Sequence, residues 1–176
     1  MSTQLSPVPH KVFRLLTVIW VGSLLTIGYA VAPVLFTLLD RSSAGAVAAQ
    51  LFRIEGLLGV VCGVLLLVLA NVLIRRGNDA YRRLRWLIAG MLVCVLLGYF
   101  ALQPFMNAIR MAALEAGTDV AHSPDAARFG LLHGVSSLFY LIESLLAIGL
   151  VWKLPTDANA ARTGAAAPSA GKGVTG

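Results

Sequence analysis

The sequence is poor in charged residues and in cysteine. Charged side chains make up 12% of the 176 residues, about half of the roughly 25% that is typical of soluble domains. Hydrophobic residues make up 58%, and the mean hydropathy is +0.82, which together exclude an ordinary soluble protein. The two cysteines, Cys62 and Cys94, both fall within apolar runs. No secreted disulfide framework is therefore expected, and we interpret them as small buried apolar side chains.

Catalytic motifs are also absent from the sequence. It contains no Gly-rich phosphate loop, no CxxC or HExxH motif and no nucleophile elbow. We therefore expect a protein that is not an enzyme, and we predict no cofactor. Zinc needs three or four ligands, and the polar groups within the apolar runs supply two good ones at most, so the sequence predicts no zinc site. A haem would need only one axial histidine, and the metal question stays open at this point.

The sequence does contain four long apolar runs, each reaching the ~20 residues that cross a bilayer core. They extend over Phe13–Leu39, Ile54–Ile74, Trp86–Met106 and Phe129–Trp152. We predict an all-α integral membrane protein, a four-helix bundle with up-down-up-down topology. Its transmembrane domain covers residues 13–153, after an N-terminal cytoplasmic segment 1–12. Residues 154–176 are rich in Ala, Gly, Pro, Ser and Thr without a periodic apolar face, which predicts a disordered cytoplasmic tail. No internal repeat is evident.

The distribution of positive charge predicts the orientation in the membrane. The net charge of +6 is compatible with nucleic-acid binding, but five arginines gather between the second and third runs, namely Arg75, Arg76, Arg82, Arg83 and Arg85. Such a cluster is typical of a cytoplasmic loop. Ten of the fourteen Lys and Arg residues then lie on the cytoplasmic side, together with both termini. We expect a multi-pass protein of the bacterial inner membrane with the lipid bilayer as its partner, no nucleic acid, and a possible homo-oligomer or membrane-protein partner.

Polar residues share helix faces at 100° per residue. In the fourth run they are His133, Ser136, Ser137, Tyr140, Glu143 and Ser144. In the third run they are Tyr99, Gln103, Met106, Asn107 and Arg110. The first run aligns Gly22, Ser23, Thr26, Tyr29, Pro33 and Thr37. The second run carries a glycine stripe, Gly56, Gly59 and Gly63, with a small-xxx-small step that is typical of close helix packing.

Antiparallel threading of the four runs brings most of these polar groups into the outer half of the bilayer. We predict an outward-facing polar pocket, which binds a ligand or has a structural role, formed by His133, Glu55, Ser136, Ser137, Tyr140, Gln103, Asn107 and Tyr29. Glu143 lies nearer the midplane as a possible intramembrane charge. The predicted packing residues are Gly56, Gly59, Gly63, Pro33 and Gly134. Ionisable residues within spans mark functional sites or buried pairs. Both a functional His133–Glu55 pair and a purely structural tie between helices stay open.

Three segments resemble a known family. They are Gly28–Phe36 at the end of the first run, Leu51–Glu55 entering the second, and Arg128–Ser137 opening the fourth, with its His-Gly-x-Ser step. They are similar to the bacterial proteins of domain of unknown function 4149, which are related to the transmembrane protein 205-like family. The resemblance covers about Val12–Lys153. It implies a four-span membrane protein, gives no established activity, and puts weight on Pro33, Phe36, Phe52, His133, Gly134 and Ser136.

These observations support three functional hypotheses. The first is a non-enzymatic bundle that binds a partner, a lipid or a small ligand in the outer polar pocket. The second is transport of a metal ion or small solute by an oligomer, with soft sulfur groups from Cys62, Met91, Cys94 and Met106. The helical wheel places Cys94 opposite the polar stripe of its run, which weakens a continuous path. The third is a haem- or quinone-linked redox protein that uses His133.

Overall fold

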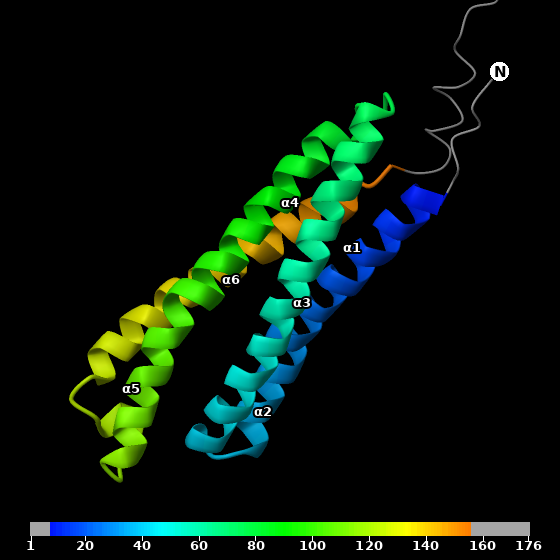
Figure 1. The fold of residues 1–176 in the computed structure, drawn as a ribbon. Coiled ribbons are helices and arrows are strands. Elements are labelled where there is room, and N and C mark those ends of the chain that lie inside the picture. Colours follow the sequence, from blue (N-terminus) through cyan, green and yellow to red (C-terminus); the bar gives the residue numbers. More distant parts are fainter. Residues whose placement is uncertain (1–7, 156–176) are drawn as a thin grey trace, which may run out of the picture.

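The computed structural model describes residues 8–155, and these form helices joined by short turns, with no strand among them. Four helical paths are long and apolar enough to cross a membrane, and they extend over Val8–Leu38, Arg41–Arg75, Tyr81–Glu115 and Ala126–Trp152. The predicted all-α membrane bundle is thereby confirmed, and the four paths follow one another up and down (Figure 1). The predicted disordered tail falls almost entirely outside the described residues.

The first and third paths each contain a π-helical turn. The first path is α1 (Val8–Thr26), η1 (Ile27–Val31) and α2 (Ala32–Leu38), and the third is α4 (Tyr81–Val95), η2 (Leu96–Leu102) and α5 (Gln103–Glu115). A proline, Pro33 or Pro104, stands in the first turn of the helix after each. Proline lacks an N–H and its ring clashes with the carbonyl four residues earlier. Widening the preceding turn to an i→i+5 pattern accommodates it.

Local hydrogen bonds set the ends of the long helix α3 (Arg41–Arg75). At its start the Asp40 carboxylate accepts a 2.9 Å hydrogen bond from the Ser43 backbone N–H, the usual role of an N-cap residue. This hydrogen bond holds the pKa of Asp40 below its usual value. At the end, Gly77 adopts φ +87°, and the N–H of Gly77 donates to the Ile74 carbonyl. A glycine in this conformation ends the helix because other residues rarely adopt it.

The connection between α5 and α6 (Ala126–Trp152) is built in the same way. Gly117 ends α5 with φ +68°, and a short 3₁₀ helix, η3 (Val120–His122), comes next. The Asp119 carboxylate accepts hydrogen bonds of 2.9 Å from the His122 backbone N–H and of 2.7 Å from the His122 imidazole. The bond to the imidazole contributes most to holding the pKa of Asp119 below its usual value.

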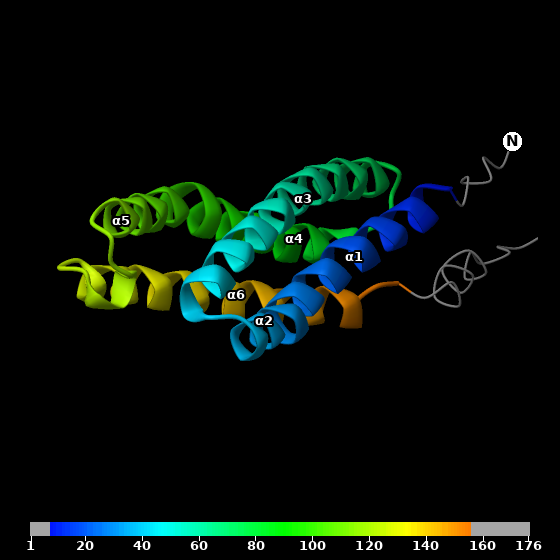
Figure 2. The same cartoon turned by 90° about the horizontal axis from the view of Figure 1, so that it is seen from below.

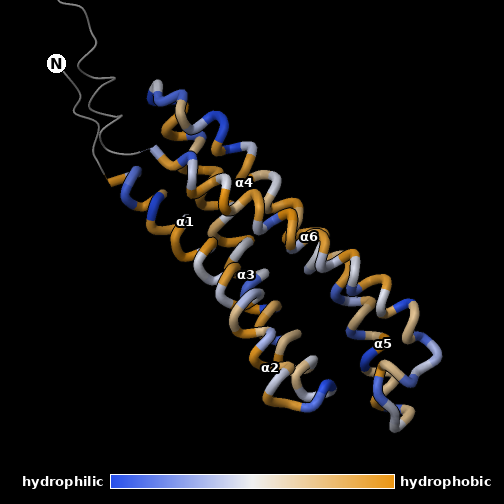
Figure 3. Tube along the Cα trace, turned by 180° about the vertical axis from the view of Figure 1, so that it is seen from behind, coloured by the Kyte–Doolittle hydropathy of each residue, from blue (hydrophilic) through white to orange (hydrophobic). Residues whose placement is uncertain are grey.

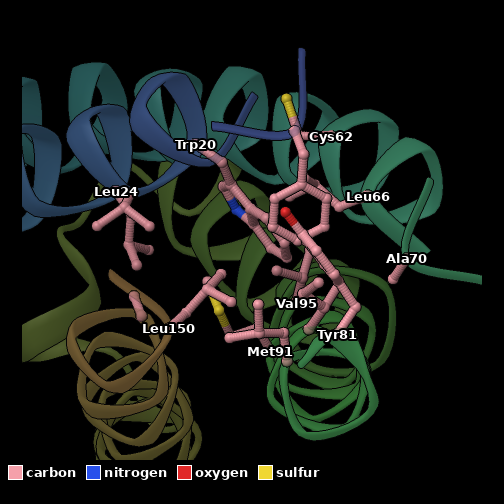
Figure 4. Packing of buried hydrophobic residues seen from close by; sticks show 14 of the residues in the cluster. Trp20, Leu24, Cys62, Leu66, Ala70, Tyr81, Met91, Val95 and Leu150 are labelled. Carbon is pink, nitrogen blue, oxygen red and sulfur yellow. The ribbon is translucent and has the colours of Figure 1, made fainter. Parts of the chain in front are cut away.

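The hydrophobic core lies at one end of the bundle. We call this the arginine end, because five arginines lie in or beside the turn that joins α3 to α4. The first residues of α1 and the last of α6 lie at the same end (Figure 1). Figure 4 shows the core around Trp20, which is fully buried. The core side chains are Phe13, Trp20, Val21, Leu24, Cys62, Leu66, Ala70, Leu73, Tyr81, Leu84, Ile88, Met91, Val95, Ala147 and Leu150.

The glycine stripe of α3 makes room for this tryptophan. A Cβ added at Gly59 would lie 2.8 Å from the indole Nε1 of Trp20, and one at Gly63 would lie 3.1 Å from the same ring. Gly56 lies one turn farther from the arginine end, beneath Tyr99. A Cβ added at Gly56 would lie 3.1 Å from the Tyr99 ring. The stripe therefore accepts aromatic side chains from the first and third paths, rather than the bare backbone of a neighbouring helix.

The opposite end of the bundle is more open. There the α2–α3 hairpin and the α5–α6 hairpin diverge (Figures 1 and 2); we call this the open end. Hydrophilic residues gather at both ends of the helices and hydrophobic ones lie between them (Figure 3). Many large apolar side chains are exposed along the spans. Such an apolar exterior is suited to lipid.

Candidate functional site

A cavity of about 830 Å³ occupies the space between the two hairpins. Residues from all four helical paths and from the connection between α5 and α6 line it. It reaches from Arg41 and Asp119 at the open end to Val95 and Glu143 at the edge of the packed core. Pockets of about 300–1,000 Å³ with aromatic walls and a few polar groups are typical ligand sites.

Two carboxyl groups lie at the inner end of this cavity. Glu55 on α3 is 4% exposed and Glu143 on α6 is 3% exposed, and both line the cavity. In each, Oε1 is buried and has no hydrogen-bond partner among residues 8–155. Leaving a buried polar atom unsatisfied costs about 1–3 kcal/mol, so this arrangement is a cost to the fold that a ligand could offset.

Aromatic rings surround the carboxyls on the side of the open end. Tyr140 on α6 is central: its ring lies 5.3 Å from that of Phe52, edge to face, and 6.2 Å from that of Tyr29. The Tyr140 hydroxyl donates a hydrogen bond to the Leu24 carbonyl on α1. This bond ties α6 to α1 just before the π-helical turn. An added Cβ at Gly28 would overlap the Tyr140 ring, so only glycine leaves room for it.

The carboxyls and their rings have the same spacing on two helices. Phe52 precedes Glu55 by three residues, and Tyr140 precedes Glu143 by three residues, so each ring shares a face with its carboxyl. Both α3 and α6 run from the open end toward the arginine end (Figure 1). Each helix therefore presents a ring above a carboxyl in the same direction. This common spacing is the signal in the sequence that identifies Phe52 as a cavity residue. A search for polar residues alone does not find it.

The open end of the cavity carries the histidine. The His133 ring stacks parallel on Phe129, with 6.2 Å between centroids and 4° between planes, and Arg110 lies 6.0 Å from the same Phe129 ring. No hydrogen bond or ion pair joins His133 to Glu55 within residues 8–155. Both groups line the same cavity but at different depths, so the structure does not bring them together as a pair.

The other predicted pocket residues divide between two hollows. Tyr29, Gln103, Ser136, Ser137 and Tyr140 line the main cavity. Asn107 instead lines a smaller neighbouring hollow, which Gln103 shares. Two predicted packing residues lie elsewhere: Pro33 is exposed at the start of α2, and an added Cβ at Gly134 would meet no atom within 4 Å.

The sulfur groups are not gathered at one place. Cys94 and Met106 line the cavity, whereas Cys62 and Met91 belong to the packed core. The helical wheel placed Cys94 opposite the polar stripe of its run, and this placement is wrong. A helical wheel assumes 100° per residue, whereas the π-helical turn η2, which follows Cys94, shifts the residues after it by about one position. Within residues 8–155, no three His, Cys, Asp or Glu side chains are grouped to hold a metal ion.

A comparison with models of protein families shows which family the chain belongs to. The model of the family described as "Domain of unknown function (DUF4149)" matches residues 15–115, more than half of the chain. The chain belongs to the DUF4149 family. The match covers the first three helical paths, with Tyr29, Glu55 and Gln103, and ends before the His-Gly-x-Ser step at His133. No curated protein and no solved structure matches the chain.

Proposed function

We propose that this DUF4149 protein is a non-enzymatic membrane protein that binds a small ligand in the cavity between its two hairpins. The observation that carries the proposal is the cavity itself, with about 830 Å³ of space lined from all four helical paths. Its volume and its mixed polar and aromatic walls are those of a small-molecule site. Tight packing at the arginine end closes it on that side. A site closed at one end favours binding over passage, so transport is the weaker proposal.

We expect that filling the cavity removes a bound molecule. Ser136 lines the cavity, and Ser136→Trp places an indole within it. Native mass spectrometry of protein purified in mild detergent should detect a bound species on the unaltered chain and lose it in Ser136→Trp. Leu138→Trp is the matched control, because Leu138 is 56% exposed on the same helix and does not line the cavity. An identical bound species in all three proteins, or none in the unaltered protein, would argue against the proposal.

We further propose that the protein lies in the bacterial inner membrane with the arginine end in the cytoplasm. The five clustered arginines support this orientation, because cytoplasmic loops carry an excess of positive charge. Anionic lipid of the cytoplasmic leaflet attracts such a loop. The open end and its cavity then face the outside of the cell.

Cysteine labelling tests this orientation. In a chain with Cys62 and Cys94 replaced by alanine, Ser136→Cys should react with a membrane-impermeant maleimide added to intact spheroplasts, because Ser136 lines the cavity. Ser144→Cys should not react, because Ser144 is 2% exposed on the same helix and lies outside the cavity. Labelling of Ser136→Cys only in inverted vesicles would reverse the proposed orientation.

A further inference from the structure

We propose that the cavity binds a hydrophobic organic cation, which the carboxylates of Glu55 and Glu143 hold beneath the rings of Phe52 and Tyr140. The inference rests on the proposed function and names the chemistry of its ligand. A protonated amine or a quaternary ammonium or phosphonium ion with apolar substituents has this chemistry.

Neither carboxyl has a cationic partner in the part of the chain that the structure describes. Both are more than nine-tenths buried, both line the cavity, and Oε1 of each has no hydrogen-bond partner. Buried acidic groups normally have a cation or hydrogen-bond donors beside them. On helix α3, Arg41 lies fourteen residues before Glu55, which is about 21 Å along the axis. A positively charged ligand would supply the missing partner to both carboxyls at once.

The surrounding rings indicate an organic cation rather than a metal ion. Seven Phe and Tyr side chains line the cavity, among them Tyr29, Phe52, Tyr99 and Tyr140, and ring faces attract cations that have lost their water. A hard metal ion prefers six or more oxygen ligands, and no third acidic, His or Cys side chain joins these two carboxyls within residues 8–155. The combination of two acids with several rings suits a bulky cation with a delocalised or shielded charge.

The inference also predicts that cation binding depends on pH. A proton and a cation compete for the same carboxylate oxygens, so cation binding should strengthen as the pH rises. His133 also lines the cavity, ten residues and about 15 Å from Glu143 along α6. The charged and titratable groups that line the cavity beside the two carboxyls are Tyr29 on η1, Arg41 on α3, Cys94 on α4, Tyr99 on η2, Arg110 on α5, Asp119 in the connection, and His133 and Tyr140 on α6.

Two ions of the same shape and opposite charge test the inference. Equilibrium dialysis of the full-length protein in neutral detergent should show saturable binding of tetraphenylphosphonium and little binding of tetraphenylborate. Glu55→Gln and Glu143→Gln should each weaken tetraphenylphosphonium binding by about tenfold or more. Glu115→Gln is the matched control, because Glu115 is exposed and lies outside the cavity. Thermal unfolding confirms that each variant is folded, and if one glutamine variant is not, the other decides.

The pH profile and the borate ion separate the possible outcomes. Binding should strengthen with pH in both the unaltered protein and His133→Gln. Equal affinity for the two ions, or unchanged tetraphenylphosphonium binding in folded Glu55→Gln and Glu143→Gln, would overturn the inference and leave the ligand cavity in place. Absence of binding by either ion would overturn it as well. The mass spectrometry of Ser136→Trp then decides the proposed function separately.

Discussion

Replacing Trp20 with alanine should lower the free energy of unfolding by about 3–5 kcal/mol, as is usual for a fully buried aromatic side chain. Trp20 is 0% exposed and packs into the space above Gly59 and Gly63. In lipid the loss comes mainly from packing, because the surrounding acyl chains are as apolar as the core. The three other helices cannot close around the void without moving the glycine stripe. Detergent-driven unfolding, followed by near-ultraviolet circular dichroism, measures the change.

Trp86→Ala is the matched control for this substitution. Trp86 is 71% exposed at the start of α4, where Arg85 lies 5.5 Å from its ring, so its removal leaves no internal void. We expect Trp86→Ala to change the free energy of unfolding by well under 1 kcal/mol, within the usual range for surface substitutions. Similar losses in Trp20→Ala and Trp86→Ala would show that the core at the arginine end is not packed as described.

The four spans are predictable from the sequence because bilayer thickness imposes one length on every crossing helix. Run length alone therefore locates the helices, although α3 begins at Arg41, thirteen residues before the predicted start at Ile54. Run length says nothing about this extension, which lies among residues of mixed polarity. Its start depends on the hydrogen bond between Asp40 and the Ser43 amide.

The arrangement of side chains is less predictable, because the π-helical turns break the helical wheel. A constant 100° per residue aligned Gly22 with Tyr29 on one face. In the structure an added Cβ at Gly22 would meet no atom within 4 Å, whereas Tyr29, beyond the start of η1, lines the cavity. Prolines mark these turns in the sequence, but a proline in a membrane helix also produces kinks. The sequence therefore does not reveal which distortion it causes.

Polarity predicted part of the cavity and missed the rest. It identified Glu55 and Tyr140, which line the inner end, because polar residues in a span are costly unless they face the bundle interior. It could not identify Gly28, whose contribution is the absence of a side chain beneath Tyr140. Such contacts between distant segments become visible only when the helices are placed together.

Gly28 provides the second large effect, because any side chain there must displace Tyr140. An added Cβ would overlap the ring, and the hydrogen bond from Tyr140 to Leu24 fixes the ring in place. Overpacking a core costs about 1–3 kcal/mol. We expect Gly28→Leu to lower the free energy of unfolding by an amount at the upper end of this range. Gly22→Leu, two turns earlier on a face with open space around it, should have little effect. Unfolding by detergent titration compares the two variants.

Removing the ring should relieve the effect of the leucine if the clash is its cause. Tyr140→Ala alone loses the hydrogen bond to Leu24 and the contact with Phe52, so it should destabilise the protein. In Gly28→Leu/Tyr140→Ala the leucine occupies space that the ring has left, and the combined loss should be smaller than the sum of the two single losses. Residues in contact couple in this way by about 0.5–3 kcal/mol, whereas distant residues add. If the loss in the double variant equals the sum of the two single losses, the leucine does not act through a clash with Tyr140. Gly28 would then be needed for the π-helical turn itself, and the contact between α1 and α6 would not depend on Gly28.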